Sequence, residues 1–254
     1  MPASVAIELP APALGAYTHA QLAFAIATWP LRAAEELRSA LIYRALAASS
    51  SAILPAVWQA RWAAIAREEV GHARLCATVG ARVGAAAPRY DAAPVRARLA
   101  TLPDPAERAL ALVLAEVAIG ETISMALFRA GRRTTVEPLA RAALAAILAD
   151  EVRHQRAGWD ALAELWPQLS DARRDALQRE AAFALAASEA TIAAPVLRRL
   201  DAGETFDPAW GELGVLPFER RVDAFYFAVE RLVIPRLARI GLDATRAWRE
   251  RYRS

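Results

Sequence analysis

The stretch ADEVRH (residues 149–154) nearly repeats an earlier stretch, REEVGH (residues 67–72). In both copies a glutamate lies three residues before a histidine, and a second acid directly precedes that glutamate. The pairs are Glu69 with His72 and Glu151 with His154. Residues three apart share one face of an α-helix, so each pair can hold an ion from one side. Because the chain has only 3 histidines, chance explains the two copies poorly. The repeat therefore predicts two helices that present metal ligands.

Each motif follows, at a similar distance, a glutamate within an apolar segment. Glu36 lies 33 residues before Glu69, and Glu121 lies 30 residues before Glu151. The segments that begin at Glu36 and at Glu121 thus form an internal repeat. If the two hairpins pack antiparallel, the polar groups of all four helices meet in the middle of a bundle. One Glu from each of two helices, with Glu-x-x-His from each of the other two, is the di-iron carboxylate arrangement.

The four buried carboxylates require compensating positive charge, because an unpaired buried carboxylate is strongly unfavourable. Two divalent ions balance their four negative charges, and neutral imidazoles complete the site. Oxygen and imidazole ligands suit iron or manganese, whereas the lack of thiolates argues against a structural zinc site. We therefore expect two Fe ions, with a Mn/Fe or Mn pair as the open alternative.

Helical patterns fill most of the chain, which is rich in the helix formers alanine and leucine. Four long helices are predicted, at residues 18–48, 55–83, 104–130 and 138–165. Residues 84–103 are expected to connect the second helix to the third. Further helices are expected over residues 170–200, with a kink near Pro195, over 218–240, and from Asp243. No alternating pattern indicates a strand, so the predicted fold class is all-α.

These elements divide the chain into three predicted regions. Residues 1–17, which contain three prolines, are expected to form an N-terminal arm. Residues 18–167 form the four-helix bundle with the di-metal site. Residues 168–254 form a C-terminal helical extension packed on that bundle.

Composition excludes several classes of protein. The net charge is only +3, and no basic run is interleaved with aromatic residues, so we expect no nucleic-acid partner. The single cysteine, Cys76, excludes an internal disulfide. The most apolar stretch, residues 109–128, contains Glu116 and Glu121, which argues against a membrane span. The N-terminus lacks the pattern of a signal peptide, so a cytoplasmic protein is expected.

On these residues, the sequence resembles the ferritin-like superfamily of di-iron carboxylate proteins over residues 30–165. The stretch DEVRH (150–154) is similar to the D-E-x-R-H box of bacterial di-iron monooxygenases and arylamine N-oxygenases. The stretch EVAIGET (116–122) resembles the G-E-T segment of a group of bacterial ferritin-like domain proteins. The resemblance implies a ferritin-like four-helix bundle with additional C-terminal helices.

The resemblance also implies a ligand set. In that group the first ligand is followed by a small residue at the third position and an aromatic residue at the seventh. Glu36, with Ser39 and Tyr43, fits this spacing, whereas Glu35 does not. One metal would then be held by Glu36, Glu69 and His72, and the other by Glu121, Glu151 and His154, with one or two carboxylates bridging.

The resemblance implies supporting roles for the acids that precede the ligand glutamates. Glu68 and Asp150 would accept the outer ring N–H of a ligand histidine across the bundle, which orients the imidazole. Arg153 is expected to pair with a nearby acid such as Glu116, and an exposed position is its alternative.

Three further residues are pocket candidates: Tyr43, Cys76 and Met125. Cys76 lies one turn after His72, at a position where the small subunits of ribonucleotide reductase carry a tyrosine. Because cysteine cannot serve as that stable tyrosyl radical, a reductase role is disfavoured. Met125 stands where hydroxylating members of the superfamily often have threonine. Ordinary core packing is the alternative for Tyr43 and Cys76.

Three functions are compatible with these residues. The favoured one is a non-haem di-iron oxidase or oxygenase that activates O₂ to oxidise a small organic substrate, with electrons from an external donor. The second is iron or peroxide handling, as in ferritins and rubrerythrins. The third is a non-enzymatic helical module with a structural metal site. We expect a monomer or a homodimer.

Overall fold

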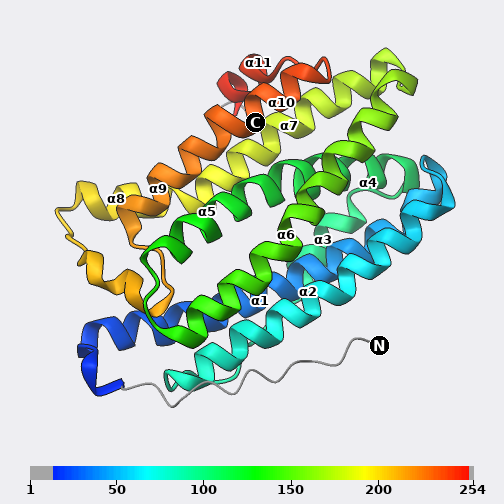
Figure 1. The fold of residues 1–254 in the computed structure, drawn as a ribbon. Coiled ribbons are helices and arrows are strands. Elements are labelled where there is room, and N and C mark those ends of the chain that lie inside the picture. Colours follow the sequence, from blue (N-terminus) through cyan, green and yellow to red (C-terminus); the bar gives the residue numbers. More distant parts are fainter. Residues whose placement is uncertain (1–13, 252–254) are drawn as a thin grey trace.

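The computed structural model describes residues 14–251, and every regular element in that range is a helix (Figure 1). The predicted all-α fold class is thereby confirmed. Most of the predicted arm 1–17 lies outside the described residues, and residues 14–16 form a single 3-10 turn, η1.

The first two long helices form an antiparallel hairpin. Helix α1 spans His19–Ser49 and α2 spans Ala56–Arg82, joined by the 3-10 turn η2 (Ser50–Ala52). A capping box starts α1, since Thr18 accepts from the backbone N–H of Gln21 and the Gln21 side chain accepts from Thr18. The two helices pack along each other at the bottom of Figure 1.

The second hairpin holds the remaining pair of long helices. One is continuous but changes its winding: α4 (Pro105–Leu112) passes into a π-helical segment, η3 (Val113–Gly120), and then into α5 (Glu121–Thr134). The other is α6 (Pro138–Leu165), followed by the 3-10 turn η4 (Trp166–Gln168). The bounds of α6 agree with the prediction.

The expected connection at residues 84–103 contains a short helix that was not predicted. Helix α3 spans Ala93–Ala100 and has Pro94 in its first turn. Proline at that position is compatible with a helix because the first N–H groups have no helical partner. Residues 84–103 therefore connect the two hairpins through one short helix.

The C-terminal helices pack mainly on the α4–η3–α5 helix and form the upper layer of Figure 1. Helix α7 (Asp171–Ile192) bends by 41° into α8 (Ala194–Asp201) at the predicted kink. The chain then continues through η5 (Pro208–Leu213), α9 (Phe218–Phe227), the π-helical η6 (Ala228–Val233), α10 (Ile234–Arg239) and α11 (Ala244–Glu250).

Two hydrophobic clusters fill the interior, one toward each end of the bundle. The larger contains Trp62 and Leu114, and the smaller contains Trp29 and Ile147. The helix Pro105–Thr134 is apolar enough to cross a membrane, but 72% of its most apolar window is buried in the described structure. It is thus the central helix of the fold. Along α2 and α6, the metal-ligand motifs lie between the segments that enter the two clusters.

Candidate metal centre

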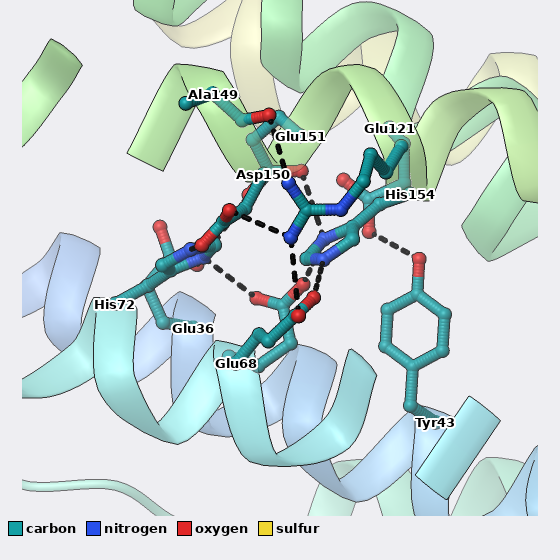
Figure 2. A network of polar contacts seen from close by, with 11 residues as sticks. Glu36, Tyr43, Glu68, His72, Glu121, Ala149, Asp150, Glu151 and His154 are labelled. Carbon is teal, nitrogen blue, oxygen red and sulfur yellow. Dashed lines mark hydrogen bonds and ion pairs between the residues drawn. The ribbon is translucent and has the colours of Figure 1, made fainter. Parts of the chain in front are cut away.

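All six predicted ligands come together from four helices and are buried, and Figure 2 labels all of them except Glu69. The contributions are Glu36 from α1, Glu69 and His72 from α2, Glu121 from the start of α5, and Glu151 and His154 from α6. The alternative first ligand, Glu35, is exposed. The helical spacing of each Glu-x-x-His pair places both of its side chains on the inward face.

Glu69 and Glu151 each direct one oxygen toward each histidine. Glu69 has Oε2 3.6 Å from His72 Nδ1 and Oε1 2.8 Å from His154 Nδ1. Glu151 has Oε1 3.3 Å from His72 Nδ1 and Oε2 3.4 Å from His154 Nδ1. Ligand atoms of these four residues all lie within 4.8 Å of one another. The group is therefore compact enough to share metal ions.

Four buried polar atoms of the group lack a hydrogen bond of acceptable geometry: Nδ1 of His72, Nδ1 of His154, Oε1 of Glu69 and Oε2 of Glu151. The closest pair, His154 Nδ1 and Glu69 Oε1, is near but not aligned as donor and acceptor. Unsatisfied buried polar atoms are unfavourable and rare in native proteins. Lone pairs of imidazole and carboxylate that converge in this way fit a cation, so the cluster could hold metal.

The outer nitrogen of each histidine contacts an acid from the opposite helix. His154 Nε2 lies 2.8 Å from Oε2 of Glu68, and His72 Nε2 lies 3.2 Å from Oδ2 of Asp150. An ionised carboxylate can only accept, so both Nε2 atoms carry the proton and donate it. When a ring is neutral, as metal binding requires, this arrangement leaves the lone pair of its Nδ1 facing the centre.

Arg153 forms ion pairs with both Glu68 and Asp150 at the surface of the protein. Its Nη2 lies 3.1 Å from Glu68 Oε1 and 2.7 Å from Asp150 Oδ1, with the side chain 56% exposed. Arg153 thus pairs with nearby acids and is also exposed, but Glu116, the acid named as an example, is not one of its partners. Glu116 instead accepts two hydrogen bonds of 2.8 Å from Arg38, which reaches it from α1. Sequence spacing could not show that the π-helical segment turns Glu116 toward α1.

Without metal, the pKa values of the two histidines are raised, whereas those of Glu69 and Glu151 are lowered. Burial lowers the pKa of His154, but contacts with Glu151 and Glu69 outweigh burial and raise it to about 10. The pKa of His72 is raised in the same manner. Burial raises the pKa of Glu151, yet the two histidines outweigh it and lower this pKa to about 2. Protonated imidazoles thus supply the positive charge that cations would otherwise supply.

Glu36 and Glu121, in contrast to Glu151, have raised pKa values. Burial raises the pKa of Glu36 to about 8, and it raises the pKa of Glu121 well above its usual range, where nearby Glu151 adds to the effect. Both carboxyls therefore hold protons at neutral pH in the metal-free protein. Cations at the centre would lower these pKa values, since opposite charge favours the ionised form.

The three pocket candidates are all buried. Tyr43, on α1, donates a hydrogen bond of 2.9 Å from its hydroxyl to Glu121 Oε1, and its ring lies 5.9 Å from that of His154. Cys76 is fully buried and belongs to the smaller hydrophobic cluster. Burial raises the pKa of its thiol, so the thiol is neutral. Met125 is 3% exposed. Of the three, Tyr43 is the candidate that forms a hydrogen bond with a predicted ligand residue.

A polar network beside Glu121 was missed in the sequence. The hydroxyl of Thr122 donates to the carbonyl of Ala118 at 2.6 Å and accepts from Gln155 Nε2 and Trp159 Nε1, both at 3.0 Å. These contacts tie η3 and α5 to α6 directly behind a predicted ligand. Threonine within an apolar helix carries no signal of such a role.

The fold and the cluster together define the class: an all-α, ferritin-like helical bundle with a buried Glu/His group that could bind metal. A solved structure with a similar fold is described as Protein 19 with aldehyde deformylating oxidase activity from Synechococcus. It aligns with a TM-score of 0.65 and 17% sequence identity, covering 93% of this chain and 98% of that chain. No family model and no curated protein sequence matches the chain. At this level of identity, the likeness establishes the fold.

Proposed function

We propose that the protein is a non-haem di-iron oxidase or oxygenase that uses O₂ to oxidise a small organic substrate. One observation carries the proposal. The two Glu-x-x-His motifs face each other, and four of their buried nitrogen and oxygen atoms have no hydrogen-bond partner. The oxidase activity named for the structural neighbour supports the same reaction class.

Each chain would hold two metal ions with the six buried residues. His72 and His154 would each bind one ion through Nδ1. Glu69 and Glu151 would each help to hold both ions, because each presents one oxygen toward each histidine. Two further glutamates would complete the set. Glu36 has Oε2 3.6 Å from His72 Nδ1, and Glu121 accepts a hydrogen bond from Tyr43. Iron is proposed over manganese from the reaction class alone.

When bound, the iron pair supplies O₂ binding and the electrons that reduce O₂. The chain's own residues prepare the environment. Glu68 and Asp150 hold both imidazoles in the metal-binding tautomer. The hydroxyl of Tyr43 holds Glu121. The hydrophobic clusters toward either end of the bundle limit access of water.

The proposed partners are O₂, a small organic substrate and an external electron donor, and the proposed location is the cytoplasm. A donor is proposed because reduction of O₂ consumes electrons, and 1 cysteine in these 254 residues cannot hold an iron–sulfur cluster of the Cys₄ type. We propose a monomer or a homodimer as the working assembly.

The test is O₂ consumption by protein loaded anaerobically with Fe(II). We expect rapid uptake of O₂, with oxidation of about two Fe(II) per chain and no further uptake until electrons are resupplied. A Glu69→Ala variant should lose this reaction, whereas Glu35→Ala, which changes an exposed neighbour of Glu36, should retain it. Continued oxidation and retention of many irons per chain would indicate iron storage instead. Loaded protein that does not react with O₂ would contradict the proposal.

A further inference from the structure

Three arginines near the C-terminal helices have no acidic partner within residues 14–251. Arg129 lies on α5, and Arg236 and Arg239 lie on α10. Arg129 and Arg239 are exposed, whereas Arg236 is partly buried. Arg236 and Arg239 are three residues apart on one face of α10, and Arg129 follows Thr122, which Arg236 contacts, by seven residues on one face of α5. Burial together with the other two charges lowers the pKa of Arg236. An uncompensated cluster of this kind attracts an anionic partner.

The cluster is connected to the metal centre through two partly buried contacts. The guanidinium of Arg236 lies 5.6 Å from the ring centroid of Trp159 and 3.5 Å from Thr122 Oγ1. The indole N–H of Trp159 donates to that same oxygen at 3.0 Å. Thr122 directly follows Glu121 in the chain. The path from Arg236 to the proposed ligand Glu121 thus consists of the Trp159 ring, its hydrogen bond to Thr122, and one peptide unit.

In an oxidase or oxygenase, this connection could carry electrons to the metal centre. Reduction of O₂ consumes electrons, and a [2Fe–2S] or [4Fe–4S] cluster of the Cys₄ type requires four cysteines. These 254 residues contain 1 cysteine. These residues therefore hold no cluster of that type, and an acidic surface on a carrier that supplies the electrons would complement the three arginines.

We propose that the face formed by Arg129, Arg236 and Arg239 docks an acidic one-electron carrier protein, and that Trp159 and Thr122 lie on the electron route to the metal centre. This inference rests on the proposed function. In each encounter the carrier is oxidised by one electron and one ferric ion is reduced to the ferrous state. Two encounters restore the pair.

Docking is tested with metal-free protein, so the result does not depend on the metal chemistry. The probe is an oxidised acidic [2Fe–2S] ferredoxin, titrated calorimetrically at low ionic strength. We expect Arg129→Glu/Arg239→Glu to weaken binding at least about tenfold, and added salt to weaken wild-type binding. The matched control is Arg44→Glu/Arg198→Glu. Both of its positions are exposed on other helices, so binding should stay within about twofold of wild type.

The route is tested with iron-loaded, oxidised protein. Trp159→Phe keeps an aromatic ring but removes the N–H that meets Thr122. We expect a lower reduction rate at saturating ferredoxin with an unchanged dissociation constant. Reduction by dihydrophenazine, a small uncharged donor, should be the same in wild type, Trp159→Phe and the Arg129→Glu/Arg239→Glu variant.

Three results would overturn the inference. One is ferredoxin binding that is absent in wild type or equally affected by both double variants. Another is binding of phosphatidylserine vesicles, but not ferredoxin, that depends on Arg129 and Arg239, since this would assign the face to a membrane. The third is a Trp159→Phe variant with an unchanged saturating rate, which removes the route. Loaded wild type that no reductant can reduce would instead contradict the proposed function and leave the docking to the calorimetric result.

Discussion

His154 is fully buried, yet carboxylates lie close to both of its ring nitrogens. Glu68 accepts from Nε2, while Nδ1 faces Glu69 and Glu151. The outer carboxylate therefore decides which nitrogen can bind a metal. The same logic applies to His72 and Asp150. In this way, acids that do not touch the metal would control the two residues that do.

We predict that Glu68→Gln weakens metal binding by about ten- to a hundredfold, because a neutral amide orients and polarises His154 less well than a carboxylate does. Competition with a metal-sensitive fluorophore measures the change. Glu35→Gln is the matched control, since Glu35 is exposed and should have no effect. Equal affinities in all three proteins would refute the role of Glu68.

The six proposed ligands could be predicted at the residue scale because metal-binding motifs constrain spacing. Glu36 could be chosen over Glu35 from the positions of Ser39 and Tyr43, and Glu36 is the buried one of the two. Whether these residues bind metal stays a prediction. The pairing of Glu116 with Arg38 and the Thr122 network could not be predicted, because they depend on how neighbouring helices rotate.

At the scale of elements, the π-helical segment η3 contains Glu116 and ends directly before Glu121. The N–H of Glu121 bonds to the carbonyl of Glu116, five residues earlier, so the helix gains one residue in that turn. The helix bounds themselves were largely predictable from caps and prolines. The π segment was not, because apolar residues on nearly every side of this helix leave no periodicity that could reveal a local change in winding.

Close contact with α6 fixes the position of η3. A Cβ at Gly158 would lie 2.8 Å from the backbone N of Ala118 and 2.8 Å from Val117 Cγ1. We predict that Gly158→Ala destabilises the protein by about 1–3 kcal/mol, since it overpacks this contact. The free energy of unfolding in urea measures the effect.

Gly71→Ala provides the control, because a Cβ at that helical position meets nothing within 4 Å. Alanine there should be neutral or stabilising by up to about 1 kcal/mol. If both variants had the same stability, the close approach of α6 to η3 would not be a constraint on the fold.

At the scale of the whole molecule, the metal-free centre holds protons on groups that would have lost them in the unfolded chain, among them His154 and Glu36. The ordinary pKa is 6.5 for histidine and 4.5 for glutamate, but in the folded protein the pKa is about 10 for His154 and about 8 for Glu36. Between pH 6.5 and pH 10, the folded state therefore binds more protons than the unfolded state. Stability contributed by these groups must fall as pH rises through this range.

We predict that the melting temperature of the metal-free protein decreases as pH rises from 6.5 toward 10. The metal-loaded protein should be more stable and show a flatter profile, because bound metal replaces those protons and binds only the folded state. Calorimetric scans with and without chelator measure both profiles. Parallel profiles would mean that metal and protons do not share the site.

The C-terminal helices illustrate what sequence could not reveal about the whole molecule. Their existence was predictable from N-caps such as Ser170 and Asp243, which the structure contains. The layer on which they pack was not, because apolar residues on several faces of α7 and α5 allow more than one partner. Where one domain ends and the next begins stays a prediction.

The central claim is that two metal ions occupy the buried Glu/His group, and metal content per chain tests it most directly. Mass spectrometry on wild type, Glu151→Ala/His154→Ala and the exposed control Glu35→Ala makes the measurement. The claim predicts close to two iron or manganese ions per chain in wild type and control, and loss of both in the double variant. Wild-type protein that remains metal-free after anaerobic reconstitution with Fe(II) would contradict it.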